Sequence, residues 1–230
     1  MARGNPKVIA VAGKGGTGKT TLCGILVRYL ASNGKKVLAV DADANSNLNE
    51  VLGVPLPLTL GEIRETMTGR EQSGDAVPGG MTKQEYMEFM MTDALTEETD
   101  YDLLVMGRSQ GSGCYCYVNG VLKTQIDRYA GVYDYVVVDN EAGLEHISRG
   151  TLPRVDVLLL VSDSSRRGIQ AAGRIAAMVK DLKLDPKVLK LVVNRAPNGK
   201  LDDGIKEEIS RQNLELIGVL PQDDNVYSFD

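Results

Sequence analysis

The feature that most constrains the fold of this chain is the stretch Val8–Thr21, where an apolar run passes into a glycine-rich turn and then into a helical pattern. Residues Gly13–Thr20 read GKGGTGKT and fit the pattern G-x-x-x-x-G-K-[ST] of a phosphate-binding loop. Glycine allows the backbone to bend with positive φ and to bring N–H groups close to phosphate oxygens, and the start of the next helix adds the positive end of its dipole. A strand, loop and helix in this order predict a nucleotide-binding site rather than an unliganded turn.

The residue types in this loop predict individual roles. We expect Lys19 to contact the β- and γ-phosphates, and we expect the hydroxyl of Thr20 to bind Mg²⁺, which prefers hard oxygen ligands. The other residues expected to surround the nucleotide phosphates are Gly15, Gly16, Thr17, Gly18 and Thr21. ATP or ADP with Mg²⁺ is the expected cofactor.

Patterning along the rest of the chain predicts a single P-loop domain over residues 1–230, an α/β fold with one doubly wound, mostly parallel sheet and helices on both faces. The expected strands are Lys7–Ala12, Lys36–Asp41, Asp102–Met106, Tyr133–Asp139, Val155–Val161, Val188–Asn194 and Leu216–Leu220. The expected helices are Lys19–Asn33, Tyr117–Ala130, Arg166–Leu182 and Lys200–Gln212, with shorter helical pieces at Leu60–Met67 and Gln84–Met91.

Composition excludes several other classes of protein. A net charge of −5 argues against nonspecific binding to nucleic acid as the main activity. The amino-terminal MARGNPK lacks the apolar core of a signal peptide, and no apolar stretch is long enough to span a bilayer, so we expect a cytoplasmic protein without a membrane partner. The segment Glu71–Asp102 carries nine acidic residues against the single basic Lys83, a pattern typical of a solvated face, and its methionines are interpreted as core residues.

Carboxylates follow two of the expected strands, at the sheet edge where open α/β folds bind ligands. Asp139 ends an apolar strand and fits a magnesium-binding Walker B aspartate, and we expect the N–H of Gly143 to sense the γ-phosphate. Asp41 and Asp43 end another strand. The run Asp41–Ser46 is also a plausible helix N-cap cluster ahead of Leu48–Leu52, and both interpretations can hold together.

The three cysteines do not suggest a disulfide framework. Cys23 lies in an amphipathic helix and is interpreted as a small buried residue. Cys114 and Cys116 form a C-x-C pair in a glycine-rich loop, where one chain offers two thiolates, whereas a tetrahedral or planar sulfur site needs four. A symmetric dimer would supply four ligands for Zn²⁺ or Ni²⁺. A local redox pair or two unrelated thiols are the alternatives.

The octet GKGGTGKT with the following Thr21 resembles the deviant Walker A motif of the MinD/ParA/nitrogenase iron protein class of dimeric ATPases. The resemblance implies that Lys14 reaches the partner subunit's nucleotide, that Asp43 orients the attacking water and that Asp41 supports the metal region. Ala44 stands where that class often has proline. The resemblance also assigns to the base side of the nucleotide the residues Asn194, Arg195, Pro221 and Asp223. The chain ends at Asp230 without the terminal helix such folds usually have, so we expect it to be shortened.

Two further stretches, GSGCYC at Gly111–Cys116 and VDNEAGLEHISRG at Val138–Gly150, look like those of CooC-type ATPases, which mature carbon monoxide dehydrogenase and acetyl-CoA synthase. This resemblance implies a homodimer that binds nickel or zinc through Cys114 and Cys116 and couples ATP hydrolysis to nickel delivery to that client enzyme. His146, the single histidine, is interpreted as a surface or capping residue.

Two other functions remain compatible with these residues. One is an iron–sulfur redox or scaffold ATPase, in which four cysteines across a dimer hold a [4Fe–4S] cluster. The other is a positioning ATPase of the ParA/MinD kind, which binds DNA or membrane as a dimer. The acidic net charge and the C-x-C pair argue against the second.

Overall fold

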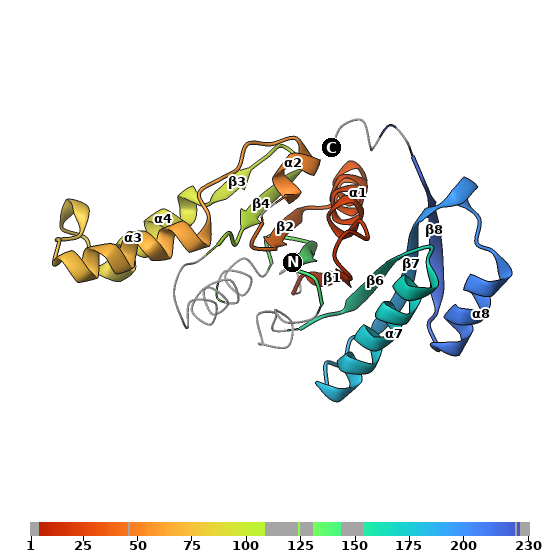
Figure 1. The fold of residues 1–230 in the computed structure, drawn as a ribbon. Coiled ribbons are helices and arrows are strands. Elements are labelled where there is room, and N and C mark those ends of the chain that lie inside the picture. Colours follow the sequence, from red (N-terminus) through yellow and green to blue (C-terminus); the bar gives the residue numbers. More distant parts are fainter. Residues whose placement is uncertain are drawn as a thin grey trace.

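The structure is a computed structural model that describes residues 5–45, 47–108, 124, 131–143, 154–223 and 225. In this part of the chain, eight strands form one sheet in the order β3-β4-β2-β5-β1-β6-β7-β8 (Figure 1). The strands are β1 Lys7–Gly13, β2 Val37–Ala42, β3 Leu95–Glu97, β4 Tyr101–Val105, β5 Tyr135–Asn140, β6 Val157–Asp163, β7 Val188–Ala196 and β8 Leu216–Pro221. Every neighbouring pair is parallel except β3 and β4, so the predicted fold class is confirmed.

Helices cover both faces of this sheet (Figure 1). Alternate strand residues point to opposite faces, so Val11 and Val137 pack against one set of helices while Ala10 and Val138 pack against the other. The first set is α1 Lys19–Ser32 and α2 Leu48–Leu52, and the second is α7 Arg166–Asp181 and α8 Asp203–Arg211 with parts of α3 Leu60–Ser73 and α4 Lys83–Asp93. Burial on both faces explains the nearly continuous apolar runs of the central strands.

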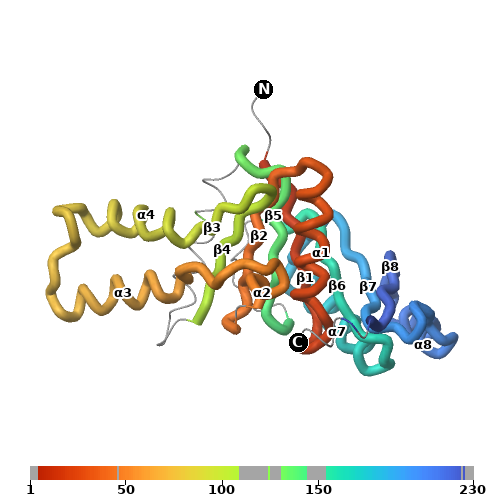
Figure 2. Tube along the Cα trace, turned by 90° about the horizontal axis from the view of Figure 1, so that it is seen from above, coloured from red at the N-terminus to blue at the C-terminus, as the bar shows by residue number. Residues whose placement is uncertain are grey.

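Helices α3 and α4 form a hairpin that extends away from the sheet (Figure 2). Each begins with a capping box, in which Thr59 and Glu62 satisfy each other's backbone N–H groups in α3, and Thr82 and Glu85 do so in α4. The hairpin leads into the short antiparallel strand β3, which the sequence pattern did not predict because three residues carry too little periodicity. The core interpretation of the methionines is confirmed for Met90 and Met91, whereas Met81 is exposed.

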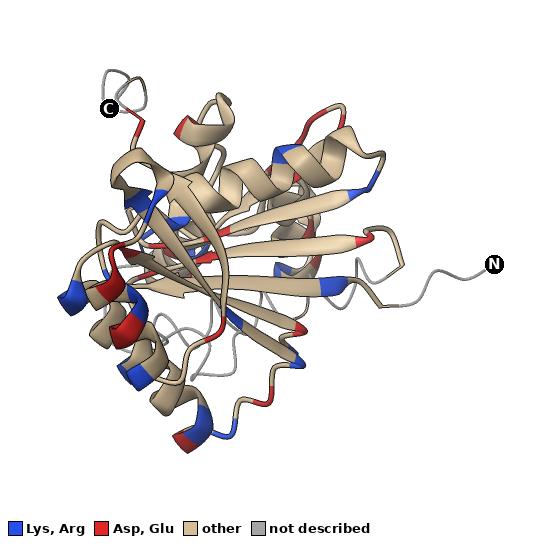
Figure 3. Cartoon of the chain, turned by 90° about the vertical axis from the view of Figure 1, so that its right-hand side faces the viewer, with Lys and Arg blue, Asp and Glu red and all other residues tan. Residues whose placement is uncertain are grey.

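Charge is mixed on the side of the molecule formed by α7 and α8 (Figure 3). Lysine and arginine residues there lie among aspartate and glutamate residues, and several form surface ion pairs such as Lys206 with Asp203 and Arg211 with Glu207. Interspersed charge of this kind is typical of a solvated face. None of the described helices is long and apolar enough to cross a membrane.

Asp156, just before β6, links the start of that strand to its two neighbours, β1 and β7. Its carboxylate accepts a hydrogen bond from the N–H of Val8 at 3.0 Å and lies 2.9 Å from Nε of Arg154 and 3.0 Å from Nζ of Lys187. Burial raises the pKa of Asp156, but these donors outweigh burial and hold the pKa at about 2. The carboxylate is therefore most stabilising when it is ionised.

We predict that this carboxylate makes stability depend on pH at the acid end. Its folded pKa lies below the ordinary value of 3.8, so its contribution is present above about pH 5 and is lost as pH falls from about 4 toward 2. Asp156→Asn should lower the free energy of unfolding by about 1 to 3 kcal/mol at pH 7, with a smaller difference at pH 3. Urea unfolding from pH 7 to 3 measures this, with the exposed Asp185→Asn as the matched control. A difference that stays constant across the range would contradict the prediction.

Candidate functional site

The glycine-rich loop between β1 and α1 adopts a conformation that only glycine reaches without strain. Gly16 has φ of 77° and Gly18 has φ of 89°. The loop closes on itself through Thr17, whose hydroxyl donates to the carbonyl oxygen of Lys14 at 2.8 Å. The side chain of Lys14 is exposed, whereas Lys19 is only 7% exposed. The loop therefore has the backbone shape that the phosphate-binding motif predicts.

Helix α1 begins differently from the other long helices of the described chain. Thr59, Thr82, Ser165 and Asp202 cap α3, α4, α7 and α8 with their side chains, whereas the N-cap residue of α1 is Gly18, which offers no side-chain cap. The first N–H groups of a helix need acceptors and lie at the positive end of its dipole. A phosphate group bound at this position would supply those acceptors.

Two neighbouring strands hold the loop in place. Gly13 lies against β6, where a Cβ would be 2.3 Å from the carbonyl oxygen of Val161. At the end of β7, the side-chain amide of Asn194 donates to the carbonyl oxygen of Thr17 at 3.0 Å, and Nη1 of Arg195 donates to that of Gly16 at 3.1 Å. Asn194 and Arg195 thus touch the loop itself, and their expected contact with the base remains a prediction.

Asp139 lies at the end of β5, beside the start of α1. Burial raises its pKa to about 6, while a hydrogen bond with Thr20 and the positive charge of Lys19 oppose that rise. Its carboxylate oxygen Oδ1 is buried and has no hydrogen-bond partner. A buried oxygen without a partner is unfavourable unless a ligand binds it, and a cation is the ligand that suits a carboxylate. Thr20 and Asp139 together therefore fit the predicted magnesium site.

Asp41 is paired in register with Asp139 and is fully buried at the end of β2. Its two carboxylate oxygens accept the N–H groups of Asp43 at 3.0 Å and Leu48 at 2.9 Å. Burial raises the pKa of Asp41 to about 7, and the charge of Asp139 adds to the rise against these backbone hydrogen bonds. Asp41 therefore organises the loop and the start of α2. The N-cap residue of α2 is Asn47, outside the run Asp41–Ser46, and its side chain makes no capping hydrogen bond.

The loop after β5 also meets the phosphate loop. The N–H of Gly143, which has φ of 100°, donates to the carbonyl oxygen of Gly13 at 3.2 Å. Asn140, which the sequence analysis did not single out, donates from its side-chain amide to the carbonyl oxygen of Val11 at 2.9 Å. A polar residue that follows Asp139 in an otherwise apolar strand is the signal that was available. The predicted sensor glycine is thus joined to the first residue of the phosphate loop.

Cys23 lies one turn into α1 and is fully buried. Burial raises the pKa of its thiol, and the charges of Asp139 and Asp41 add to this effect. The interpretation of Cys23 as a small buried residue is confirmed. An inert, protonated thiol beneath the carboxylates is not suited to act as a metal ligand.

Other predicted residues lie farther along the sheet or outside the described chain. Pro221 pairs with Ala196 at the end of β8, and the carboxylate of Asp223 accepts the N–H of Asn225 at 2.9 Å. Cys114, Cys116 and His146 lie outside the described residues. Among the described residues, no group of three or more His, Cys, Asp and Glu side chains is placed to hold a metal ion.

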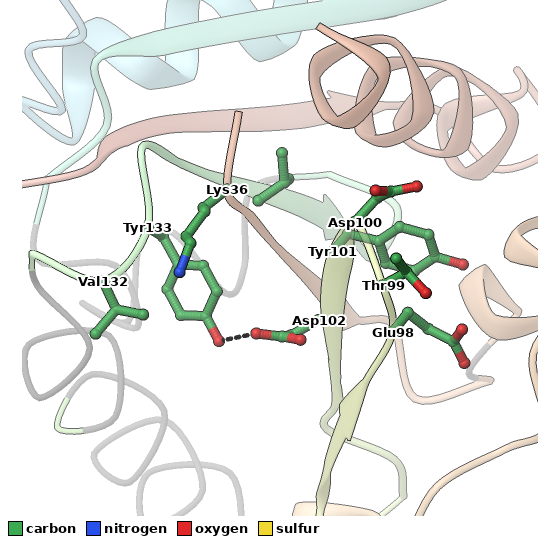
Figure 4. Close-up of a pocket in the computed structure, with 9 residues that line it drawn as sticks. Lys36, Glu98, Thr99, Asp100, Tyr101, Asp102, Val132 and Tyr133 are labelled. Atoms are coloured by element: carbon green, nitrogen blue, oxygen red, sulfur yellow. Dashed lines mark hydrogen bonds between the residues drawn. The ribbon is translucent and has the colours of Figure 1, made fainter. Parts of the chain in front are cut away.

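A hollow of about 130 Å³ lies at the edge of the sheet opposite the phosphate loop, where the strands begin (Figure 4). The Tyr133 hydroxyl donates a hydrogen bond to the Asp102 carboxylate within it, and Lys36 lies beside the Tyr133 ring. Its lining also includes Glu98 and Asp100. This hollow shares no residue with the phosphate loop.

Known proteins resemble this chain in sequence and in fold. The model of the CobQ/CobB/MinD/ParA nucleotide binding domain matches residues 8–230. The chain is 42% identical over 223 residues to an ATP-binding protein of Methanocaldococcus jannaschii, covering 97% of this chain and 87% of that protein. It is 32% identical over 233 residues to the carbon monoxide dehydrogenase accessory protein CooC of Rhodospirillum rubrum, covering 96% and 86%.

Solved structures agree on the fold. The cell division ATPase MinD of Pyrococcus furiosus matches with a TM-score of 0.67 at 24% identity, covering all of this chain and 87% of that one. A ParA family ATPase from Chlorobium tepidum matches with a TM-score of 0.70 at 20% identity, covering 97% and 87%. At these identities the likeness establishes the fold.

We predict that Gly13→Ala destabilises the nucleotide-free protein by about 1 to 3 kcal/mol, because the added methyl group forces β1 and β6 apart. Gly15→Ala is the matched control, since a Cβ there meets no atom within 4 Å. Urea unfolding without nucleotide compares the two variants with the unmodified chain. Equal stabilities for the two variants would contradict the close approach of β1 and β6.

Proposed function

Because the chain belongs to the CobQ/CobB/MinD/ParA family of nucleotide-binding domains and is an ATPase of the MinD/ParA class, we propose that it is a nucleotide-gated metallochaperone. In this proposal a homodimer binds nickel or zinc and assists nickel insertion into carbon monoxide dehydrogenase or acetyl-CoA synthase. The 32% identity to CooC over 96% of the chain, together with the C-x-C pair, is the observation that carries the metal and client part.

The described residues support the nucleotide half of this function. The uncapped start of α1 and the buried Lys19 would bind the triphosphate, and Thr20 and Asp139 would hold magnesium. Magnesium, when bound, neutralises charge on the phosphate oxygens. Asp43, in the loop after β2, would orient the attacking water, so hydrolysis needs no covalent intermediate.

The dimer completes both sites in this proposal. Lys14, exposed in the phosphate loop, would place its ammonium on the partner's nucleotide, where it stabilises charge in the transition state. Closure of two subunits over two nucleotides would also bring two Cys114 and Cys116 pairs to one ion. Four thiolates suit tetrahedral zinc or planar nickel. Metal affinity then depends on nucleotide state, and linkage requires the reverse dependence as well.

We predict that Lys14→Ala binds ATP with nearly unchanged affinity but hydrolyses it about 100-fold or more slowly, because a trans-acting cation stabilises mainly the transition state. Lys19→Ala should instead lose ATP binding. Phosphate release and binding of a fluorescent ATP analogue measure the two effects, with the exposed Lys35→Ala as the matched control. Normal hydrolysis by Lys14→Ala would refute the trans role.

We predict that the unmodified ATP-loaded dimer carries about one nickel or zinc ion, and that a variant with both Cys114→Ser and Cys116→Ser carries almost none. Elemental analysis of anaerobically purified protein, with and without ATP and alongside its mass in solution, measures this, with Cys23→Ala as the cysteine control. If the double cysteine variant carries as much metal as the unmodified protein, the proposed metal site is wrong.

The same preparations separate the alternative functions. Iron with visible absorption at about 400 nm would identify a [4Fe–4S] ATPase instead. ATP-dependent sedimentation with DNA or liposomes would identify a positioning ATPase.

Metal content that is the same in Lys19→Ala and in the unmodified protein would show that metal binding does not depend on nucleotide binding, and would refute the proposed gating.

A further inference from the structure

We propose that Arg108 is a positioning residue for ATP hydrolysis, and that it acts through Asn45 on the loop that presents Asp43. This inference rests on the proposed role of Asp43 in orienting water. It concerns a contact between two segments that are 63 residues apart in the sequence and that meet beside the nucleotide site.

A chain of two hydrogen bonds joins Arg108 to Asp43. Nη2 of Arg108 donates to the side-chain oxygen of Asn45 at 2.7 Å. The backbone N–H of Asn45 in turn donates to Oδ1 of Asp43 at 2.8 Å. Because the second bond comes from the backbone of Asn45, a shift of that residue moves the donor that orients the Asp43 carboxylate.

The centre of the loop after β2 is restrained by a contact of its own. Asp41 fixes its two ends, through the N–H of Asp43 and the N–H of Leu48. Asn45 lies between them and is exposed, and the neighbouring Ala44 does not restrict its own φ as a proline would. A long-range hydrogen bond to Asn45 therefore restricts the part of the loop that Asp41 does not reach.

The backbone that carries Arg108 is itself fixed, so the side chain extends from a rigid base. The N–H of Met106 donates to the carbonyl oxygen of Asp41 at 2.8 Å, and the carbonyl of Met106 accepts the N–H of Gly61 at 2.9 Å. Gly61 packs so closely that a Cβ there would lie 2.0 Å from the carbonyl oxygen of Arg108. Gly107, with φ of 66°, packs against Thr59 in the same way.

This arrangement places Arg108 between two parts of the molecule. Its backbone contacts the start of α3, and its side chain contacts the loop after β2. The donor is charged and the acceptor is a neutral amide, which makes the bond stronger than one between neutral groups. Its loss should change the orientation of Asp43 without removing any group expected to bind the phosphates.

The test is a double-mutant cycle of Arg108→Ala and Asn45→Ala in the full chain, read out as kcat and KM for ATP. Asn45→Ala retains the backbone N–H that Asp43 accepts and removes the acceptor of Arg108. We expect each single variant to lower kcat by about 3- to 30-fold with KM within about 2-fold, and the double variant to be no slower than the slower single variant.

A conservative variant of Asn45 and the thermal stability of each variant distinguish a positioning role of Arg108 from a general structural role. Asn45→Asp keeps an oxygen acceptor for Arg108 and should retain kcat within about 3-fold. The thermal midpoint of each variant should stay close to that of the unmodified protein, because both side chains are exposed. Arg174→Ala, on the exposed side of α7, is the matched arginine control and should leave kcat unchanged.

Unchanged kcat in Arg108→Ala, multiplicative losses in the double variant, or a raised KM at constant kcat would each overturn the inference. Asp43→Ala keeps this outcome distinct from failure of the proposed function. If Asp43→Ala retains full kcat, the proposed role of Asp43 is wrong. If Asp43→Ala loses kcat while Arg108→Ala does not, only the positioning role of Arg108 is wrong.

Discussion

The parallel alignment of the central strands is the constraint on which this site depends. Parallel strands end at the same edge of a sheet, so residues far apart in the chain reach one place: Gly13 beside Val161, Asp41 beside Asp139, and Asn194 against the phosphate loop. Helices on both faces bury those strands and hold their ends in register. The backbone of the loop and the uncapped start of α1 lie at that edge, in an arrangement that suits a phosphate group.

Burying carboxylates at this edge is unfavourable for the isolated fold. Burial raises the pKa of Asp41 to about 7 and that of Asp139 to about 6, so both carboxylates are harder to ionise than in water. Asp41 offsets this penalty by accepting two backbone N–H groups, which makes it a structural residue. Asp139 retains a buried oxygen without a partner, which suits a residue whose stabilising contact is a bound cation. The two aspartates thus serve different purposes despite their shared register.

Much of this site was predictable because its chemistry lies in short stretches of sequence. The motif at Gly13–Thr20 implies positive φ and a helix start, and the structure contains both. The helices of the α3 and α4 hairpin were predicted only in part, as Leu60–Met67 and Gln84–Met91, and the edge strand β3 was not predicted. The three residues of β3 carry too little periodicity to predict a strand.

The sequence by itself determined the α/β class, the phosphate loop and the carboxylates at the strand ends, because each depends on residue type and local spacing. Only the tertiary structure decided which distant groups touch that loop. Asn194 and Arg195 hold its carbonyls, Gly143 meets Gly13, and Arg108 reaches Asn45. Hydrogen bonds between segments far apart in the chain leave no periodic trace in either segment, so they follow from strand order and packing alone.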